Sequence, residues 1–312
     1  MQPRRILVTG AGGFVGRHLL PALRERFPNA ELIPSGFDVA DAGAVGDGVA
    51  EARPDALVHL AGVAAPGDAR RDPDRAWRVN LHGSLHVAQA VRRAAPGCTL
   101  LFASSADAYG ASFRPGGAVD ESVALAPLNT YAATKAAADL ALGAMAAEGL
   151  RAIRLRPFNH TGPGQSEAFV VPAFARQAAL VAAGLQEPVL QVGALEPQRD
   201  FLDVRDVCAA YASALAHADS LEPGTILNLA SGTPRRIGDI LRELLDLAGV
   251  EAEVRTDAAR LRPSEIPVAA GDAGRARRLL DWAPRIPWTQ TLADVLADWR
   301  ERVGAGRLSE PG

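Results

Sequence analysis

Residues 6–16 read Ile6-Leu7-Val8-Thr9-Gly10-Ala11-Gly12-Gly13-Phe14-Val15-Gly16, an aliphatic run followed at once by clustered glycines. From residue 14 to residue 27 the apolar side chains recur at helical spacing. A strand, a glycine turn and a helix in this order are typical of a nucleotide-binding α/β unit. The glycines at 10, 13 and 16 give the spacing G-x-x-G-x-x-G, which lets a diphosphate approach the backbone amides at the helix start. We therefore predict a dinucleotide-binding turn at residues 10–16.

Strand and helix signals continue to alternate through the first half of the chain. Strands are predicted at residues 31–34, 56–62, 99–105 and 151–156, and helices at 77–93 and 130–148. This alternation predicts an α/β fold with a Rossmann-type, doubly wound parallel sheet. Ligands of such sheets bind beyond the carboxyl ends of the strands. We therefore expect the glycine turn, Ala61-Gly62, Ser104-Ser105 and residues 157–165 to lie around one cleft.

The composition narrows the class of protein. Of 312 residues, 48% are hydrophobic and 22% are charged, as in ordinary soluble globular proteins. A net charge of −3 predicts no binding to nucleic acid or to an anionic membrane, and no apolar run is long enough to span a bilayer. Cys98 and Cys208, far apart in the sequence, favour reduced thiols in a cytoplasmic protein without a targeting segment. The six histidines predict no metal site, and we expect His82 and His86 at a surface or an interface.

Lys135 is the only lysine among the 33 basic residues, and one of the three tyrosines, Tyr131, stands four positions before it. On a helix, residues i and i+4 share a face, so the phenol and the ammonium would lie side by side. An ammonium in that position favours the phenolate and is expected to lower the pKa of the tyrosine from about 10. The pattern alone also fits an ordinary helix in which the two residues are neighbours without a function.

Gly10-x-x-Gly13-x-x-Gly16, Asn80, Ser105 and Tyr131-x-x-x-Lys135, in this order, resemble an extended short-chain dehydrogenase/reductase of the NAD-dependent epimerase/dehydratase family. The resemblance covers essentially the whole chain. Within that superfamily, four later segments are most similar to the GDP-4-keto-6-deoxy-D-mannose reductases. These segments are residues 156–165, 199–206, 262–265 and 282–287.

The resemblance implies NAD(P)H-dependent reduction of the C4 keto group of a nucleotide-activated 4-keto-6-deoxyhexose. GDP-4-keto-6-deoxy-D-mannose and the product GDP-D-rhamnose lead among the candidates, while the nucleotide base and the stereochemistry at C4 (rhamnose or talose) stay open. In this reaction Tyr131 supplies the proton, Lys135 lowers the Tyr131 pKa and holds the nicotinamide ribose, and Ser105 hydrogen-bonds the carbonyl oxygen. The alternatives are a nucleotide-sugar 4-epimerase, a 4,6-dehydratase of the same superfamily, and a non-catalytic nucleotide sensor.

Residues 104–110 bear on the dehydratase alternative, because removing a proton from C5 and protonating the C6 hydroxyl needs extra carboxylates beside the serine. Ala106 cannot serve in that way, and only Asp107 could. Asp107 is therefore a candidate catalytic residue that is compatible with a reductase. As an alternative, it is a solvated carboxylate in a loop.

The resemblance also implies the residues that bind NAD(P)H and the sugar nucleotide. The cofactor-binding residues would be Gly10, Gly13, Phe14, Val15, Gly16, Asp38, Val39, Leu60, Ala61, Gly62, Asn80, Tyr131, Lys135 and Pro157. The substrate-binding residues would be Ser104, Ser105, Asn159, Arg199, Arg262 and Glu265. The segment after the second strand is short and lacks the usual residue that selects between NAD and NADP, so both cofactors remain open.

Several of these roles have structural alternatives. Arg199 and Arg262 are expected to bind the diphosphate or ribose. Asn159 would lie beside them, and Glu265 would contact the ribose or base. As alternatives, Arg199 could pair with Asp200 or Asp203, and Arg262 could be a solvated loop residue. Asn80 could cap backbone amides at a helix start. Asp206 is predicted to cap the helix that runs through residues 211–217.

The expected domain organisation follows the resemblance. A dinucleotide-binding domain would comprise residues 1–160 with a return segment at about 200–230. A smaller α/β cap for the substrate would comprise residues 161–199 and 231–312. A homodimer is expected through the helices at 81–93 and 130–148, which present alanine and leucine faces.

Overall fold

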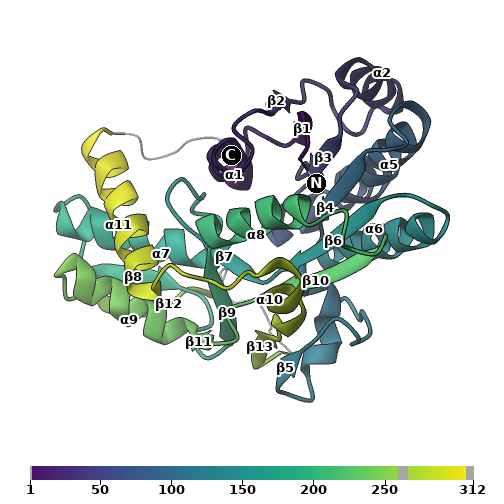
Figure 1. The fold of residues 1–312 in the computed structure, drawn as a ribbon. Coiled ribbons are helices and arrows are strands. Elements are labelled where there is room, and N and C mark those ends of the chain that lie inside the picture. The colour runs from purple at the N-terminus through teal and green to yellow at the C-terminus, as the bar shows by residue number, and fades with distance from the viewer. Residues whose placement is uncertain (1, 259–265, 307–312) are drawn as a thin grey trace.

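The computed structural model describes residues 2–258 and 266–306. Arg262 and Glu265, two of the expected substrate-binding residues, lie outside this part of the chain. Two layers of structure, described below, meet at the carboxyl ends of a parallel sheet (Figure 1).

The first layer is a six-stranded sheet in which every pair of neighbours is parallel, in the order β10-β6-β4-β3-β1-β2. Its strands are β1 (Arg5–Thr9), β2 (Glu31–Pro34), β3 (Ala56–His59), β4 (Thr99–Ala103), β6 (Ala152–Pro157) and β10 (Thr225–Leu229). The Rossmann-type α/β fold class predicted from the sequence is confirmed. The strand order reverses at β1: β2 lies on one side of it, and β3 with the later strands lies on the other. The turns that follow β1 and β3 therefore lie at the usual ligand site of such sheets.

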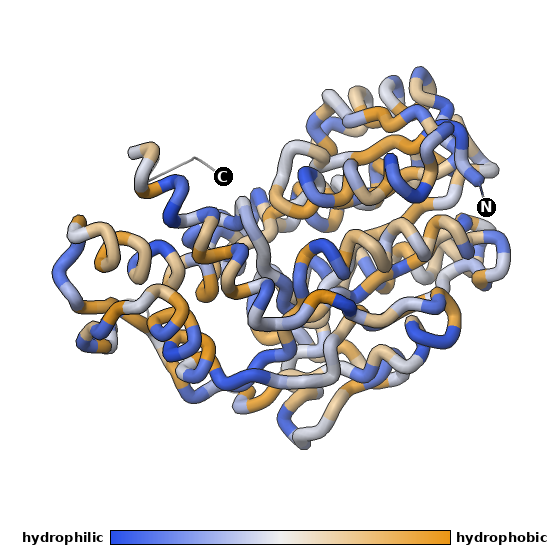
Figure 2. Tube along the Cα trace, turned by 60° about the vertical axis from the view of Figure 1, so that its left-hand side comes forward, coloured by the Kyte–Doolittle hydropathy of each residue, from blue (hydrophilic) through white to orange (hydrophobic). Residues whose placement is uncertain are grey.

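Helices cover both faces of this sheet. The first face packs against α1 (Phe14–Arg26) and α8 (Val204–Ala216), and the second against α2 (Ala42–Ala52), α5 (Gly83–Ala94) and α6 (Thr130–Ala147). Successive residues of a strand enter the cores on opposite faces of the sheet. Ile6 and Val8 face α1 and α8, while Leu7 faces α2, α5 and α6. In Figure 2 these strands form the orange interior of the upper half of the molecule.

The second layer holds a smaller mixed sheet and a separate core. Its strands are β11 (Pro234–Arg236), β9 (Gln198–Asp203), β13 (Val268–Gly271) and β5 (Ala118–Val119), with β7 (Asn159–Thr161) beside β9 and a two-stranded pair formed by β8 (Val189–Val192) and β12 (Glu253–Thr256). The core of this layer is built by α7 (Val170–Ala182), α9 (Ile237–Ala248) and α11 (Trp288–Gly304), at the left of Figure 1.

Short helical segments complete the described chain. They are α3 (Pro66–Arg71), α4 (Pro73–Ala76), a π-helical turn η1 (Trp77–His82), the 3-10 segment η2 (Ala106–Phe113) and α10 (Gly274–Leu280). The helix predicted at 77–93 thus begins earlier, at Pro73, and passes through a π turn before it continues as α5. His82 is exposed as expected, whereas His86 is half-buried and its Nδ1 lies 3.0 Å from the carbonyl oxygen of Val39.

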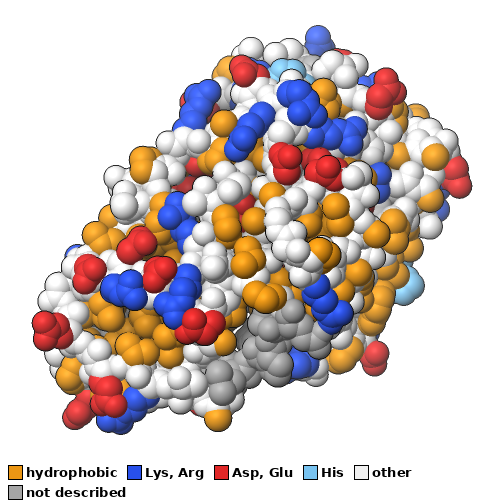
Figure 3. Space-filling view, turned by 90° about the horizontal axis from the view of Figure 1, so that it is seen from below, with side chains coloured by type: hydrophobic (Ala, Val, Ile, Leu, Met, Phe, Trp, Pro, Cys, Tyr) orange, Lys and Arg blue, Asp and Glu red, His pale blue; other side chains and the backbone are white. Residues whose placement is uncertain are grey.

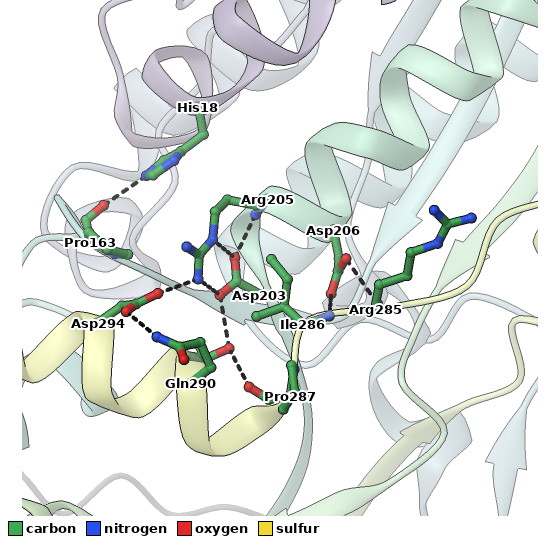
Figure 4. Close-up of polar contacts among 11 residues, drawn as sticks. His18, Pro163, Asp203, Arg205, Asp206, Arg285, Ile286, Pro287, Gln290 and Asp294 are labelled. Atoms are coloured by element: carbon green, nitrogen blue, oxygen red, sulfur yellow. Dashed lines mark hydrogen bonds and ion pairs between the residues drawn. The ribbon is translucent and has the colours of Figure 1, made fainter. Parts of the chain in front are cut away.

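The start of α8 corrects one expectation. The helix begins at Val204, and its N-cap is Asp203, whose carboxylate accepts a hydrogen bond from the amide of Arg205. Asp206 is not the cap: it accepts hydrogen bonds from the amides of Arg285 and Ile286 and so ties the segment before α11 to α8 (Figure 4). Because these partners lie 79 and 80 residues away, the role of Asp206 depends on tertiary structure.

Surface features fit the composition. On the face shown in Figure 3, basic and acidic side chains are interspersed, with no large area of a single charge sign. Among the described residues, no helix is both long enough and apolar enough to cross a membrane. The same residues contain no group of three or more His, Cys, Asp or Glu side chains that could hold a metal ion.

Candidate active site

A cavity of about 460 Å³ lies at the carboxyl ends of the parallel strands, between the two layers. It brings together four segments that the sequence analysis expected to converge: the glycine turn, Ala61-Gly62, Ser104-Ser105 and the residues after β6. Predicted site residues that line it are Gly10, Gly13, Phe14, Val15, Gly16, Leu60, Ala61, Gly62, Ser104, Ser105, Asp107, Tyr131, Lys135, Pro157 and Asn159.

The glycine turn has the geometry that a diphosphate requires. Gly10 has φ of +69°, and a Cβ atom there would lie 2.7 Å from the amide nitrogen of Ala61, so only glycine fits. A Cβ on Gly16 would collide with the carbonyl oxygens of Gly10 and Ala11. Gly13 stands at the N-cap of α1, and no side chain caps the helix amides. The uncapped start of α1 therefore faces the cavity as an anion site, which the diphosphate of NAD(P) fits.

Asp38 and Val39, expected near the adenine, do not line the cavity. Asp38 is exposed, and its carboxylate accepts a hydrogen bond from the amide of Ala40 two residues later. The Val39 side chain is buried in the core formed with α2 and α5, where it packs close to Gly83. A side-chain contact of Val39 with adenine is therefore not supported by this structure.

Lys135 is held at the base of the cavity. Asn129 caps α6 through a hydrogen bond from the amide of Ala132, which fixes the start of the helix. One turn further, the Lys135 Nζ donates a 2.7 Å hydrogen bond to the carbonyl oxygen of Ala103 and lies 5.0 Å from the centre of the Phe102 ring. Burial lowers the pKa of Lys135 to about 8, against the opposing charge of Asp139.

Tyr131 differs from the expectation drawn from its spacing to Lys135. Its pKa is raised, mainly by burial and further by the charge of Asp107, while a hydrogen bond with Ser105 acts in the opposite direction. The Lys135 ammonium donates its hydrogen bond to the carbonyl oxygen of Ala103 and not to the Tyr131 hydroxyl. The predicted lowering of the Tyr131 pKa is therefore wrong for the protein without ligands. Tyr131 is a neutral phenol at neutral pH, which is the form that can donate a proton.

Asp107 is a half-buried cavity residue and not a solvated loop carboxylate. Ser105 caps the η2 segment by accepting a 3.1 Å hydrogen bond from the Asp107 amide, which fixes both residues at the cavity wall. Burial raises the pKa of Asp107, and the positive charge of Arg199 opposes this rise. Arg199 is thus near enough to Asp107 for their charges to interact. The alternative partners have other contacts: Asp200 with Ser231 and Asp203 with Arg205.

A buried polar cluster supports this wall from below. The fully buried Asp139 carboxylate accepts hydrogen bonds of 2.6 to 2.9 Å from Ser104 Oγ, from Nε and Nη2 of Arg156, and from Nη1 of Arg154. Burial alone would raise the pKa of Asp139, but Arg156, Ser104 and Arg154 together hold it below its ordinary value. Ser104 lines the cavity, yet its hydroxyl proton is donated to Asp139. The Ser104 hydroxyl thus ties the cavity wall to Asp139, and because its oxygen can still accept a hydrogen bond, the expected contact with substrate stays a prediction.

The same cluster positions the η2 segment. Arg156 donates from Nη1 to the hydroxyl of Tyr109, which in turn donates to Oδ1 of Asn228 in β10. The Arg156 guanidinium also lies over the Tyr109 ring, 5.0 Å from its centre. Because Tyr109 belongs to η2, this chain anchors the segment that carries Asp107 to the parallel sheet.

Asn80 holds the loop after β3 against α6. It is buried, its Oδ1 accepts from the Val63 amide, and its Nδ2 donates to the Val63 carbonyl and to Thr134 Oγ1. It therefore caps the backbone of a loop and not a helix start. Its Oδ1 would lie 3.0 Å from a Cβ on Gly62, so the side chain reaches the edge of the cavity without lining it.

A neutral histidine lies behind Asn80. Ser84 Oγ donates to the Asn80 carbonyl, so His59 Nε2 must donate to Ser84, and His59 Nδ1 then accepts from the Thr9 hydroxyl. Burial, with a contribution from the charge of Lys135, lowers the pKa of His59 to about 3. His59 therefore stays uncharged and links β1 and β3 to α5.

Tyr211 was missed by the sequence analysis. Its side chain lines the cavity and is only 1% exposed, and within the described residues its hydroxyl has no hydrogen-bond partner. It comes from α8, which also touches the glycine turn through a 3.7 Å contact from Cys208 Sγ to the Val15 carbonyl oxygen. The rarity of tyrosine in this chain was the only sequence signal that pointed to it.

Comparisons with known proteins agree with this geometry. The model of the NAD dependent epimerase/dehydratase family matches residues 6–230. GDP-6-deoxy-D-mannose reductase of Pseudomonas aeruginosa is 39% identical over 303 residues, which are 96% of this chain and 98% of that protein. UDP-glucose 4-epimerase of Azospirillum brasilense is 26% identical over 99% of this chain and 96% of its own length.

Solved structures give the same result. The structure of RMD from Pseudomonas aeruginosa complexed with NADPH superimposes with a TM-score of 0.87, at 37% identity, and the match covers 96% of this chain and 99% of that one. A putative epimerase from Burkholderia cenocepacia superimposes with a TM-score of 0.81, at 32% identity, over 96% of this chain and 100% of that one. The fold is thus shared over nearly the full length of these proteins.

Proposed function

The chain belongs to the NAD dependent epimerase/dehydratase family, and from this premise we propose that it reduces the C4 keto group of a nucleotide-activated 4-keto-6-deoxyhexose with NADPH or NADH. The proposed substrate is GDP-4-keto-6-deoxy-D-mannose and the proposed product is GDP-D-rhamnose, in keeping with the 39% identity to a GDP-6-deoxy-D-mannose reductase. The observation that carries the proposal is the arrangement of Ser105, Tyr131 and Lys135 around a cavity that also contains the glycine turn.

The residues divide the work of the reduction as follows. When bound, the dinucleotide supplies a hydride for C4, and the uncapped start of α1 with Gly10 and Gly16 holds its diphosphate. Tyr131, kept neutral by burial and by Asp107, donates its proton to the oxygen on C4. Ser105 hydrogen-bonds the same oxygen and stabilises the charge that develops there.

Lys135 prepares this proton transfer. One of its N–H groups is used by the Ala103 carbonyl, and an ammonium has three donors. We assign the other donors to hydroxyl groups of the cofactor ribose. The charge of Lys135 then also stabilises the phenolate that Tyr131 becomes after it has given up its proton.

A 4,6-dehydratase is disfavoured by the wall beside Ser105. Position 106 is a buried alanine, and Asp107, the one carboxylate there, interacts with the positive charge of Arg199. Two separate proton transfers, at C5 and C6, would need a second acid or base beside Ser105. We therefore assign Asp107 to shaping the charge of the site in the reductase reaction.

We further propose that the two layers are a dinucleotide-binding domain and a substrate cap, divided as the sequence predicts, and that the protein forms a homodimer through α5 and α6. The outer face of α6 supports a dimer because it carries a row of alanines interrupted by Leu140, which is 60% exposed. Small side chains let helices approach closely, and a large exposed leucine among them is what a partner helix would cover.

The function is tested by mixing the protein with NADPH or NADH and freshly prepared 4-keto-6-deoxy sugars on GDP, dTDP and CDP, and following cofactor oxidation by absorbance. The expected result is oxidation with the GDP sugar and a product whose NMR spectrum is that of GDP-D-rhamnose. No oxidation with any sugar, together with tightly bound NAD and interconversion of C4 epimers, would identify an epimerase instead. A talose product would contradict only the assigned C4 stereochemistry and would leave the reductase assignment intact.

A further inference from the structure

Arg235 is an arginine without the partners that a partly buried guanidinium normally has. Within the described residues its side chain makes no hydrogen bond and no ion pair, and its Nε is buried without a partner. Burial lowers the pKa of Arg235, and only the more distant charges of Glu243 and Asp200 oppose that shift. Asp200 is itself occupied by Ser231 and Gly232. Buried polar groups are nearly always satisfied, so this one calls for an explanation.

The register of the smaller sheet places Arg235 directly opposite Arg199. Antiparallel partners that face each other point to the same side of a sheet, so the two guanidinium groups share one face. On its other side Arg199 has Ala269, a small residue of β13, as its neighbour.

That face of the sheet is the one that borders the cavity. Side chains alternate along β9, so Arg199 lies on the same side as Phe201, which lines the cavity, while Asp200 points away and is buried. Phe201 contacts Trp288 with ring centres 5.6 Å apart, and Arg235 lies over Trp288 at 4.9 Å. The indole Nε1 of Trp288 is also buried without a partner. Two donors without acceptors thus lie together beside the cavity.

Resting on the proposed function, we propose that Arg235 binds the diphosphate of the sugar nucleotide together with Arg199, with Trp288 holding the Arg235 guanidinium in place. A diphosphate bound between the two arginines supplies the acceptor that the buried Arg235 guanidinium lacks. Asn159 lies opposite Phe201 across β7 and β9 and therefore faces the same space.

Neighbouring Arg236 provides a matched control. It has the same charge and stands one position later, so it points to the opposite side of β11, where it binds Glu196 through Nε and Nη2. The experiment measures binding of GDP, pyrophosphate and guanosine, each alone, to the wild-type protein and to Arg235→Ala, Arg235→Lys and Arg236→Ala by calorimetry. Thermal unfolding without ligand is recorded for each protein.

We expect Arg235→Ala to weaken binding of GDP and of pyrophosphate about 10- to 100-fold, as for a lost hydrogen bond to a charged group. Guanosine binding should be unchanged, Arg235→Lys should be intermediate, and Arg236→Ala should bind GDP like the wild type. Because Arg235 is uncompensated in the free protein, Arg235→Ala should leave its melting temperature unchanged or raise it. In turnover, Arg235→Ala should raise KM with little change in kcat.

Three results would overturn the inference. If Arg235→Ala bound GDP as tightly as the wild type does, Arg235 would not contact the diphosphate. A lower melting temperature of that variant would make the Trp288 contact structural, and a selective loss of guanosine binding would place Arg235 at the base. If the wild-type protein bound neither GDP nor pyrophosphate, the proposed function itself would fail, which is a separate outcome.

Discussion

Lys135 donates a 2.7 Å hydrogen bond from Nζ to the carbonyl oxygen of Ala103, the last residue of β4. This contact joins the Tyr131 turn of α6 to the edge of the parallel sheet and holds an ammonium group in a place that is 7% exposed. The cost of that burial appears in the pKa of Lys135, which falls from 10.5 to about 8.

The depressed pKa predicts how stability depends on pH. Between pH 8 and 10.5 the unfolded chain keeps a proton on Lys135 that the folded chain has released, so this group makes the wild-type protein more stable as pH rises through that range. Below pH 8 it destabilises the fold by at most about 3 kcal/mol. Lys135→Met should therefore be inactive but more stable than the wild type at pH 7. The lost hydrogen bond to Ala103 should reduce this gain in unfolding free energy by about 1 kcal/mol.

Urea unfolding of Lys135→Met and of the wild type at pH 7 and pH 10 checks this. The advantage of the variant should shrink or disappear at pH 10. An equal difference at both pH values would mean that Lys135 is not held in a strained charged state.

The interacting charges of Asp107 and Arg199 make a second prediction. Asp107 places a negative charge beside an arginine expected to bind an anionic diphosphate. At pH 8, Asp107→Asn should therefore bind GDP more tightly than the wild type, by roughly 2- to 10-fold, on the order of 1 kcal/mol for a nearby charge. Asp107→Glu, which keeps the charge, should bind GDP like the wild type. Weaker GDP binding by Asp107→Asn would show that Asp107 positions Arg199 instead of competing for it.

The glycine turn offers a steric test with its own control. A Cβ on residue 16 would collide with the carbonyl oxygens of Gly10 and Ala11, whereas a Cβ on residue 12 has no atom within 4 Å. Gly16→Ala should lose NADPH binding by at least about 10-fold because the turn must open, while Gly12→Ala should bind normally. Fluorescence titration of NADPH measures both. Equal affinities would show that the diphosphate does not use this turn.

Much of the fold could be predicted because local signals and tertiary structure agree. The strand at residues 31–34 has the predicted bounds, and α1 begins at Phe14 as predicted and ends at Arg26, one residue before the predicted end. A short apolar run and a glycine turn specify these positions locally. The helix predicted at 130–148 ends one residue earlier, and it starts at Thr130 because Asn129 caps it.

The parts that could not be predicted depend on contacts between distant segments. Asp203 and Asp206 both stand near the start of α8, and only the position of residues 285 and 286 determines that Asp206 binds their amides. The pKa of Tyr131 depends on Asp107, which a motif of five residues does not include. Arg235 lies on the same face of the smaller sheet as the cavity residue Phe201 because of the register of β11 on β9, and no local pattern distinguishes it from Arg236.

The Asp139 cluster predicts a large effect on stability. Asp139→Asn leaves Arg154 and Arg156 buried with an uncompensated charge, and breaking a buried ion pair costs about 3–5 kcal/mol. Ser104→Ala removes one hydrogen bond to the same carboxylate and should cost only about 1–3 kcal/mol. Urea unfolding gives both values. A cost below 1 kcal/mol for Asp139→Asn would mean that water or rearrangement compensates the two arginines.

The proposed dimer can be tested on two leucines of similar exposure. Leu140 on α6 is 60% exposed within the proposed interface, and Leu185, after α7 in the other layer, is 63% exposed and outside it. A glutamate in a packed helix interface would be buried without a partner, so Leu140→Glu should convert the dimer to a monomer. Leu185→Glu adds the same charge at a solvated position and should leave the dimer intact. Light scattering after size-exclusion chromatography measures the molar mass of each, and a monomeric wild type, or a dimer that survives Leu140→Glu, would contradict the interface.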